Sequence, residues 1–278
     1  MTLRLLVLAV LLAGCGASAQ QPGAGTATPS DPTQASEETT VPGIAPKDTG
    51  FPIDAKPRPI VLVGSPLVVD KGFHTDAEKA DVGRGGFTFV GTPPKTPDPQ
   101  DVQLPDGQVK LSLISALDAV RAMSVEQVDN PVKLVKAEEG TYEFLSDRGK
   151  LALPSWRFTT ESGTELVWPA PVPEAFWGMG INQPSTSAPS ATESGSTLEV
   201  VMESAPSPCP GDQPATAEPV VHESDKSVIV SVKINGEVGD CPRDLALHTQ
   251  AYQVKLAKPL GARLLLDTGG GVVPVTKR

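Results

Sequence analysis

Residues 141–168, which read TYEFLSDRGKLALPSWRFTTESGTELVW, decide the fold class of this chain. Bulky residues recur there with a period of two, so that the members of each pair share one face of a strand. The pairs are Tyr142 with Phe144, Trp156 with Phe158, and Leu166 with Trp168. Turn-forming residues separate the pairs at 147–149 and 161–164. The stretch therefore predicts an antiparallel meander of three strands.

One amphipathic helix is expected before the meander, at about 112–124. Its buried face would consist of residues spaced i, i+4, i+7 and i+10, with Ser112 as the N-cap. These residues are Leu113, Leu117, Val120 and Met123. We expect the helix to lie over the aromatic face of the sheet. The result would be an α+β domain over residues 59–182.

The rest of the chain predicts an all-β domain over residues 197–278. Val228, Val230, Val232 and Ile234 alternate along one strand face, and the glycine-rich stretch 267–271 is typical of a hairpin loop. Five to seven short strands in about 80 residues favour a small β-sandwich. The Ser-, Thr- and Pro-rich stretch 183–196 is expected to be a linker between the two domains.

A disulfide between Cys209 and Cys241 is expected to staple the second domain. Each cysteine adjoins a proline in a turn-like sequence. The bridge would close a loop of about 33 residues, worth on the order of 3–4 kcal/mol in the chain-entropy treatment. The alternative is a metal or redox pair, but the chain has no C-x-x-C sequence and its three histidines are scattered.

The N-terminus has the pattern of a secretory signal peptide over residues 1–14, with Arg4 before a short apolar run. The run is too short to span a bilayer, which needs about 20 apolar residues. Leu12-Ala13-Gly14-Cys15 resembles the bacterial lipobox at all four positions. That resemblance implies that Cys15 carries a diacylglyceryl group, with palmitate-type chains, on the outer face of the cell membrane. The alternative is an ordinary signal peptide with a chance cysteine.

Residues 15–58 are expected to form a disordered tether behind this anchor. They are rich in Pro, Thr, Ser and Gly, and so hold too little apolar surface to offset the entropy of ordering. A flexible chain of this length reaches roughly 35–40 Å. The tether would hold the folded domains away from the lipid headgroups.

The charge balance excludes nucleic acid as a partner. The chain has 33 acidic and 23 basic residues, a net charge of −10. Loss of Arg4 with the signal peptide would leave 22 basic residues and a net charge of −11. Such a surface repels phosphate backbones and anionic headgroups. Membrane attachment would therefore depend on the lipid anchor.

Motifs that suggest chemistry are better explained as structural features. Leu266-Asp267-Thr268-Gly269 resembles the aspartic-protease signature, but only nine residues follow it and a hairpin turn is the preferred interpretation. Asp240, Asp244 and His248 are spaced four apart, although Pro242 argues against the helix that would align them on a metal. No G-x-S-x-G or Walker sequence occurs. We predict no catalytic, cofactor-binding or metal-ligating residues.

The aromatic cluster leaves one candidate site. Seven of the 12 aromatic residues fall within 36 residues, and their first interpretation is the core of the sheet. Trp177 lies beyond the meander among glycines and prolines, so we expect it to be more exposed than Trp156. The hypothesis is that Trp168 and Trp177 edge a groove for a peptide or glycan.

Several stretches resemble actinobacterial envelope lipoproteins of unassigned function. They are 104–107 with 114–117, 146–149 with 153–156, and Pro259-Leu260-Gly261-Ala262-Arg263. The order of helix and meander is also similar in outline to PepSY-type envelope modules, which act by binding. These resemblances imply a non-enzymatic binding module with an envelope protein or glycan partner, and they carry over no catalytic residue. The alternatives are an envelope hydrolase acting on glycan or peptide, or an accessory subunit of a membrane complex.

Overall fold

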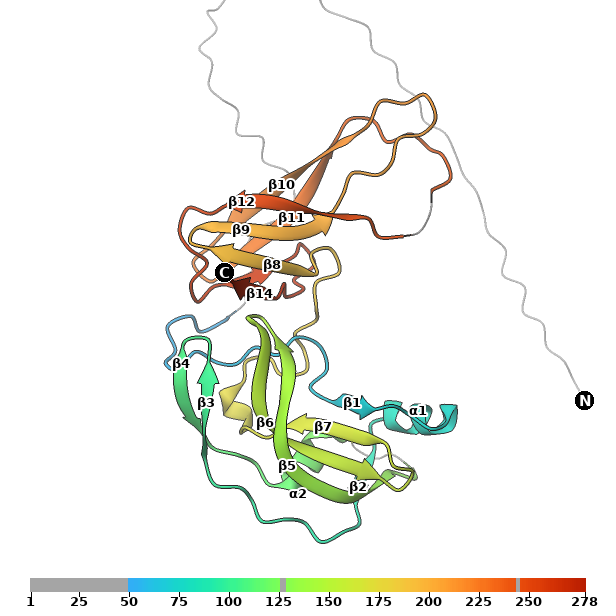
Figure 1. The fold of residues 1–278 in the computed structure, drawn as a ribbon, viewed down its shortest axis with the longest axis vertical. Helices are drawn as coiled ribbons and strands as arrows, with labels where there is room; N and C mark the ends of the chain where they lie inside the picture. Colours follow the sequence, from blue (N-terminus) through green and yellow to red (C-terminus); the bar gives the residue numbers. More distant parts are fainter. Residues whose placement is uncertain (1–49, 126–128, 244–245) are drawn as a thin grey trace, which may run out of the picture. The chain divides into compact units, whose positions relative to one another are not determined.

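The structure, a computed structural model, describes residues 50–125, 129–243 and 246–278, and Figure 1 shows its elements. In chain order these are β1 (Val68–Lys71), α1 (Asp76–Gly83), β2 (Phe87–Phe89), β3 (Gln100–Leu104), β4 (Gly107–Leu111), α2 (Ala116–Met123), β5 (Val132–Ser146), β6 (Gly149–Thr160), β7 (Glu165–Pro169), the 3-10 turn η1 (Pro173–Ala175), β8 (Ser190–Ser194), β9 (Thr197–Glu203), β10 (Thr216–Glu223), β11 (Ser227–Asn235), β12 (Thr249–Lys255), β13 (Leu264–Leu266) and β14 (Val275–Lys277). The chain is mostly β, with α+β and all-β parts, as the sequence predicts.

The predicted meander is confirmed as β5, β6 and β7. The strands are antiparallel, and Trp156 lies opposite Glu139 on one side and Trp168 on the other. Two further strands extend the sheet to the order β1-β7-β6-β5-β2. The β-branched and aromatic residues at 86–90 predict β2, whereas β1 was not predicted, because it is short and partly exposed and carries little periodic signal.

The predicted helix is α2, which lies on the expected face but begins later. Its N-cap is Ser115, whose Oγ accepts a hydrogen bond from the backbone N–H of Asp118, in place of the predicted Ser112. Leu117 is consequently 37% exposed, whereas Ala116 and Ala119 are fully buried. The helix packs with Trp156 and other aromatic residues of the meander in one core cluster.

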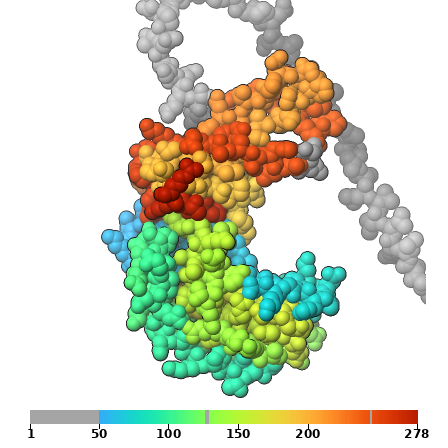
Figure 2. Space-filling view, in the orientation of Figure 1, coloured from blue at the N-terminus to red at the C-terminus, as the bar shows by residue number. Residues whose placement is uncertain are grey.

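Helix α1 was not predicted, because it is hardly amphipathic. Val82 is its one buried residue, and the helix lies on the surface in Figure 2. Its N-terminus does carry a recognisable signal. Thr75 Oγ1 accepts a hydrogen bond from the backbone N–H of Glu78, the spacing of a capping box.

The second part of the chain is a two-layer β-sandwich. One sheet has the order β10-β11-β13 and the other β12-β9-β8-β14. Apolar side chains from both sheets form one core cluster between them, which includes Leu198, Val200, Val228 and Val230. The sandwich-like architecture that the sequence predicts is therefore present.

The stretch 183–196 is structured, although we expected a linker. It contains β8, which pairs with β9 on one side and with β14 on the other. Ala188 and Ala191 are buried in the sandwich core. The sequence did not predict this strand, because its buried positions hold small residues. Bulky apolar residues are the ones that normally indicate a buried strand face.

The two predicted domains share a core cluster, which also includes part of the predicted tether. Phe51, assigned to the tether by composition, is fully buried and packs with Val61, Leu264 and Val272. The described residues from Gly50 onward belong to one compact unit. The remaining tether residues, up to 49, lie outside the described part.

The turn between β5 and β6 docks against the end of the sandwich. The backbone N–H of Val275 in β14 donates to the carbonyl oxygen of Asp147 at 3.0 Å, and Figure 2 shows β14 next to this turn. Arg58 is ion-paired with Asp147 and donates to the carbonyl oxygen of Ala262. Arg148 donates to the carbonyl oxygen of Gly261 at 2.6 Å. Asp106 lines the same cavity as Asp147 and Arg148. Three stretches that carry the lipoprotein resemblance, 104–107, 146–149 and 259–263, thus lie near one another.

Candidate functional site

The predicted groove between Trp168 and Trp177 is not supported by their packing. Trp168 is 6% exposed and lies in the cluster beneath α2. Trp177 lies in the cluster shared with the sandwich, where its ring meets that of Phe51 edge to face at 5.2 Å. The two rings therefore belong to different parts of the core. Trp177 is only partly buried and is more exposed than Trp156, as the sequence predicts, but its ring contacts Phe51, which the sequence assigned to the tether.

The structure confirms the disulfide between Cys209 and Cys241. Their sulfur atoms are bonded, and their Cα atoms are 5.9 Å apart. The bridge joins two long connections of the sandwich, one from β9 to β10 and the other from β11 to β12. We call residues 204–215 and 236–248 together the clamped arm; within it, residues 244–245 lie outside the described residues.

Arg243 provides a second tie between the two halves of the clamped arm. Its Nη2 donates to the carbonyl oxygen of Gly239 at 2.8 Å, on its own connection. Its Nε donates to the carbonyl oxygen of Ser207 at 3.0 Å, on the other. The same Nη2 lies 3.3 Å from Cys209 Sγ. The guanidinium group is thus committed to holding the arm together.

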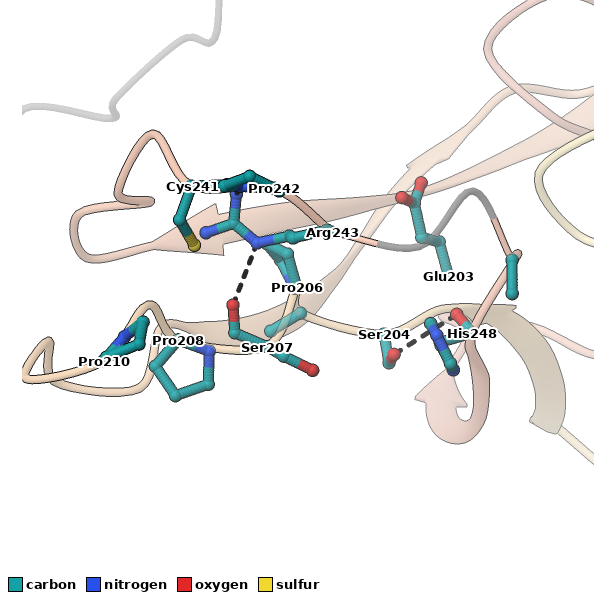
Figure 3. A pocket seen from close by; sticks show the side chains of 12 residues that line it. Glu203, Ser204, Pro206, Ser207, Pro208, Pro210, Cys241, Pro242, Arg243 and His248 are labelled. Carbon is teal, nitrogen blue, oxygen red and sulfur yellow. Dashed lines mark hydrogen bonds between the residues drawn. The ribbon is translucent and has the colours of Figure 1, made fainter.

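A pocket of about 420 Å³ opens between the two halves of the arm (Figure 3). This volume is within the range of small-ligand sites. Four prolines line it: Pro206, Pro208, Pro210 and Pro242. Glu203, Arg243 and His248 add the charged and titratable groups. We refer to this cavity as the proline pocket.

The proline pocket is poor in hydrogen-bond donors. A proline has no backbone N–H, so four of its lining residues offer carbonyl oxygens only. The donors of Arg243 are used within the arm. Ser204 donates to the carbonyl oxygen of His248 through both its backbone N–H, at 2.9 Å, and its Oγ, at 3.2 Å. The pocket therefore suits a ligand that brings its own donors.

The charges of this region favour a cation over an anion. Glu203 and the clamped arm, residues 203–215 and 236–248, contain five acidic side chains and one basic one, Arg243, a net charge of −4. The exposed Glu203 carboxylate lies on the pocket itself. Phosphate or carboxylate ligands would meet repulsion here and find few N–H groups to bind them. An ammonium or guanidinium group brings three to five donors and the complementary charge.

The predicted protease-like motif is a hairpin turn. The carboxylate of Asp267 is buried and accepts hydrogen bonds from the backbone N–H of Gly271 at 2.7 Å and from Ser185 Oγ at 2.8 Å. Leu266 and Val272 pair across the turn as an antiparallel bridge. Asp267 thus closes the hairpin and fastens the start of the 183–196 stretch.

The spaced residues Asp240, Asp244 and His248 are not brought together as a described site, since Asp244 lies outside the described residues. His248 lines the proline pocket, and Asp240 is exposed beside Cys241. Among the residues that the structure describes, no cluster of three His, Cys, Asp or Glu side chains is arranged to hold a metal ion.

Glu78, in the first turn of α1, has the most strongly shifted carboxyl group among the described residues. Burial raises its pKa, but hydrogen bonds from Ser162, Thr164, Thr160 and the backbone N–H of His74 outweigh burial and lower the pKa to about 2. Such a carboxylate remains ionised near neutral pH and is a weak base. The cluster is therefore better explained as a cap that fixes α1 to the β6–β7 turn.

Comparison of the chain with family models, with curated proteins and with solved structures finds no match. The resemblance to envelope lipoproteins accordingly stays a prediction. Cys15 and the signal peptide lie outside the described residues. Within the described part, no helix has the length and apolar character needed to cross a bilayer.

Proposed function

We propose that this chain is a lipid-anchored, extracytoplasmic binding module that presents the proline pocket to a partner in the cell envelope. The pocket carries the proposal, because it is open, has the volume of a ligand site and presents the exposed carboxylate of Glu203. The disulfide supports the location, since such bonds persist in oxidising compartments outside the cytoplasm. Cys15 would supply the anchor and the first part of the tether its reach.

A binding role accounts for the pocket better than hydrolysis does. Hydrolysis of a glycan or peptide needs a base or acid whose pKa lies near the working pH. At the proline pocket, Glu203 ends β9 and His248 directly precedes β12, so the two come from the same end of one strand pair and not from opposing walls of a cleft, and Arg243 is engaged in the arm. Rigid walls of proline favour recognition instead, because little conformational entropy is lost when a ligand binds to them.

The test is site-specific photo-crosslinking in intact cells. A photoreactive residue in place of Ser207, on the exposed rim of the pocket, is compared with one in place of Asp101, on the exposed face of β3. We expect one discrete crosslinked species from position 207 and none from position 101. A Cys15→Ala variant should leave the membrane fraction and lose the crosslink.

Two results would overturn the proposal. One is the same crosslinking pattern from both positions, which would show that the pocket is not the contact surface. The other is a Cys15→Ala variant that stays in the membrane fraction and keeps its crosslink, which would show that a lipid on Cys15 does not anchor the protein.

A further inference from the structure

Strand β12 forms an open edge of the sandwich next to the proline pocket. In the described part of the chain β12 pairs with β9 alone, and the order of its sheet is β12-β9-β8-β14. Strand β10 of the facing sheet comes near β12 but does not pair with it. An unpaired edge offers a row of N–H and C=O groups to another strand.

The hydrogen-bond pattern identifies which groups of β12 point outward. Ser204 N–H donates to the carbonyl oxygen of His248, and Leu256 N–H donates to that of Ser196. With the register of Thr249 opposite Glu203, the even-numbered residues of β12 are the hydrogen-bonded partners of β9. The odd-numbered residues therefore direct their N–H and C=O groups away from β9. They are Thr249, Ala251, Gln253 and Lys255, and all four are exposed.

This edge lacks the features that normally protect an edge strand. β12 is seven residues long, contains no proline and pairs with β9 without a register shift. Its one charged residue, Lys255, stands at the far end. By contrast, the edge strand β10 contains Pro219, and the edge strand β14 has only three residues. Natural sheets block such edges with prolines, bulges, charges or short strands.

The open edge leads directly into the proline pocket. His248 lines the pocket and is followed at once by Thr249, the first residue of β12. Glu203, opposite Thr249 in the register, lines the pocket as well. A polypeptide that extended the sheet along β12 would therefore reach the pocket with its next residues.

We propose that the ligand of this module is an extended, basic polypeptide that adds as a strand to β12 and places a Lys or Arg side chain in the proline pocket. This inference rests on the proposed binding function and names the partner class. Backbone pairing with residues 249–255 supplies affinity and register. The Glu203 carboxylate on the pocket supplies the preference for a cationic side chain, and the net charge of −4 over residues 203–215 and 236–248 adds to it.

The experiment measures binding of a fluorescein-labelled eight-residue peptide of alternating Lys and Val to the full chain by fluorescence anisotropy. Two peptides serve as controls. One has Glu in place of Lys, and the other keeps Lys but carries an N-methyl group on every backbone amide, which leaves neither edge of the peptide with N–H groups for strand pairing. We expect both controls to bind at least tenfold more weakly than the Lys peptide.

Variants of the chain test the same contacts from the other side. Ala251→Pro removes one outward N–H of the edge, and the matched control Ala251→Val keeps it. Glu203→Gln removes the carboxylate of the pocket. We expect Ala251→Pro and Glu203→Gln each to weaken binding about tenfold, which corresponds to about 1.4 kcal/mol, and Ala251→Val to bind within twofold of the unchanged chain.

Equal binding of the N-methylated peptide would overturn the strand addition even if Ala251→Pro failed to fold. Equal binding of the Glu peptide would overturn the basic partner. A dimer that forms through β12 in sedimentation, and that the Lys peptide does not dissociate, would assign the edge to a second copy of the chain. If the position-207 crosslink persists while the Lys peptide does not bind, the binding function stands and this partner class fails.

Discussion

Removal of the disulfide tests how far the clamped arm depends on its covalent link. The change is the double variant Cys209→Ser with Cys241→Ser. The two cysteines are 32 positions apart, so that the bridge closes a loop of 33 residues. The chain-entropy relation assigns such a loop about 3.7 kcal/mol at 25 °C. For a folded region of this size, that corresponds to a fall in Tm of roughly 7–15 °C.

The assay is thermal unfolding followed by circular dichroism, with the oxidised unchanged chain as reference and the same chain under reducing conditions as control. The reduced chain and the double variant should unfold at the same temperature. The position-207 crosslink should weaken in both, because the walls of the proline pocket come from the two connections that the bridge joins. A Tm shift below about 2 °C with an unchanged crosslink would refute the reasoning, since Arg243 alone would then hold the arm.

Three further changes test the core contacts and the cap of α1. Phe51→Ala should lower the free energy of unfolding in urea by about 3–5 kcal/mol, because the ring is fully buried, and Phe51→Leu should lower it far less. A loss below 1 kcal/mol for Phe51→Ala would show that this residue belongs to the tether and not to the core. Gly149→Ala should cost about 1–3 kcal/mol, because φ is +81° and the new Cβ would lie 2.9 Å from Thr276 Cγ2. Its matched control is Gly140→Ala in the same sheet, where nothing lies within 4 Å of the added Cβ, and equal losses at both sites would contradict the account. Glu78→Gln should be less stable than the unchanged chain at pH 7. The pKa of Glu78 in the folded state lies near 2, below the ordinary 4.5, so the ionised carboxylate stabilises the fold above the unfolded pKa. This stabilisation should disappear as the pH falls from about 4.5 to about 2. A difference in Tm that does not depend on pH would show that the ionised form is not the stabilising one.

The elements that the sequence predicts well are those with local, repeated signals. The meander has aromatic pairs with period two and clear turns, and β5 to β7 contain all three pairs. Cys209 and Cys241 are the only cysteines beyond residue 15, so their pairing needs no knowledge of the fold. The hairpin at Asp267 follows from its glycines.

The elements that the sequence hides depend on contacts with distant residues. β8 consists of small and polar residues, and its burial becomes visible only with β9 and β14 beside it. Phe51 stands in a proline-rich stretch, and its partner Trp177 is 126 positions away in the chain.

The proline pocket was also missed, although a signal for it exists. Prolines stand close to both cysteines, at Pro208 and Pro210 on one side and Pro242 on the other. Once the disulfide is predicted, these residues must gather around it. Their lack of N–H groups could have indicated a donor-poor surface. That β12 lies at an open edge could not have been predicted, because no local sequence pattern specifies the order of the strands in the sheet.

The most direct test of the central claim is site-resolved amide hydrogen exchange by NMR, with and without the peptide of alternating Lys and Val. The account predicts that the peptide slows exchange at the outward amides of Ala251 and Gln253. The amides of Tyr252 and Val254, which already pair with β9, should change little. Protection that is equal along odd and even positions, or that falls on β10 or β14 instead, would contradict it.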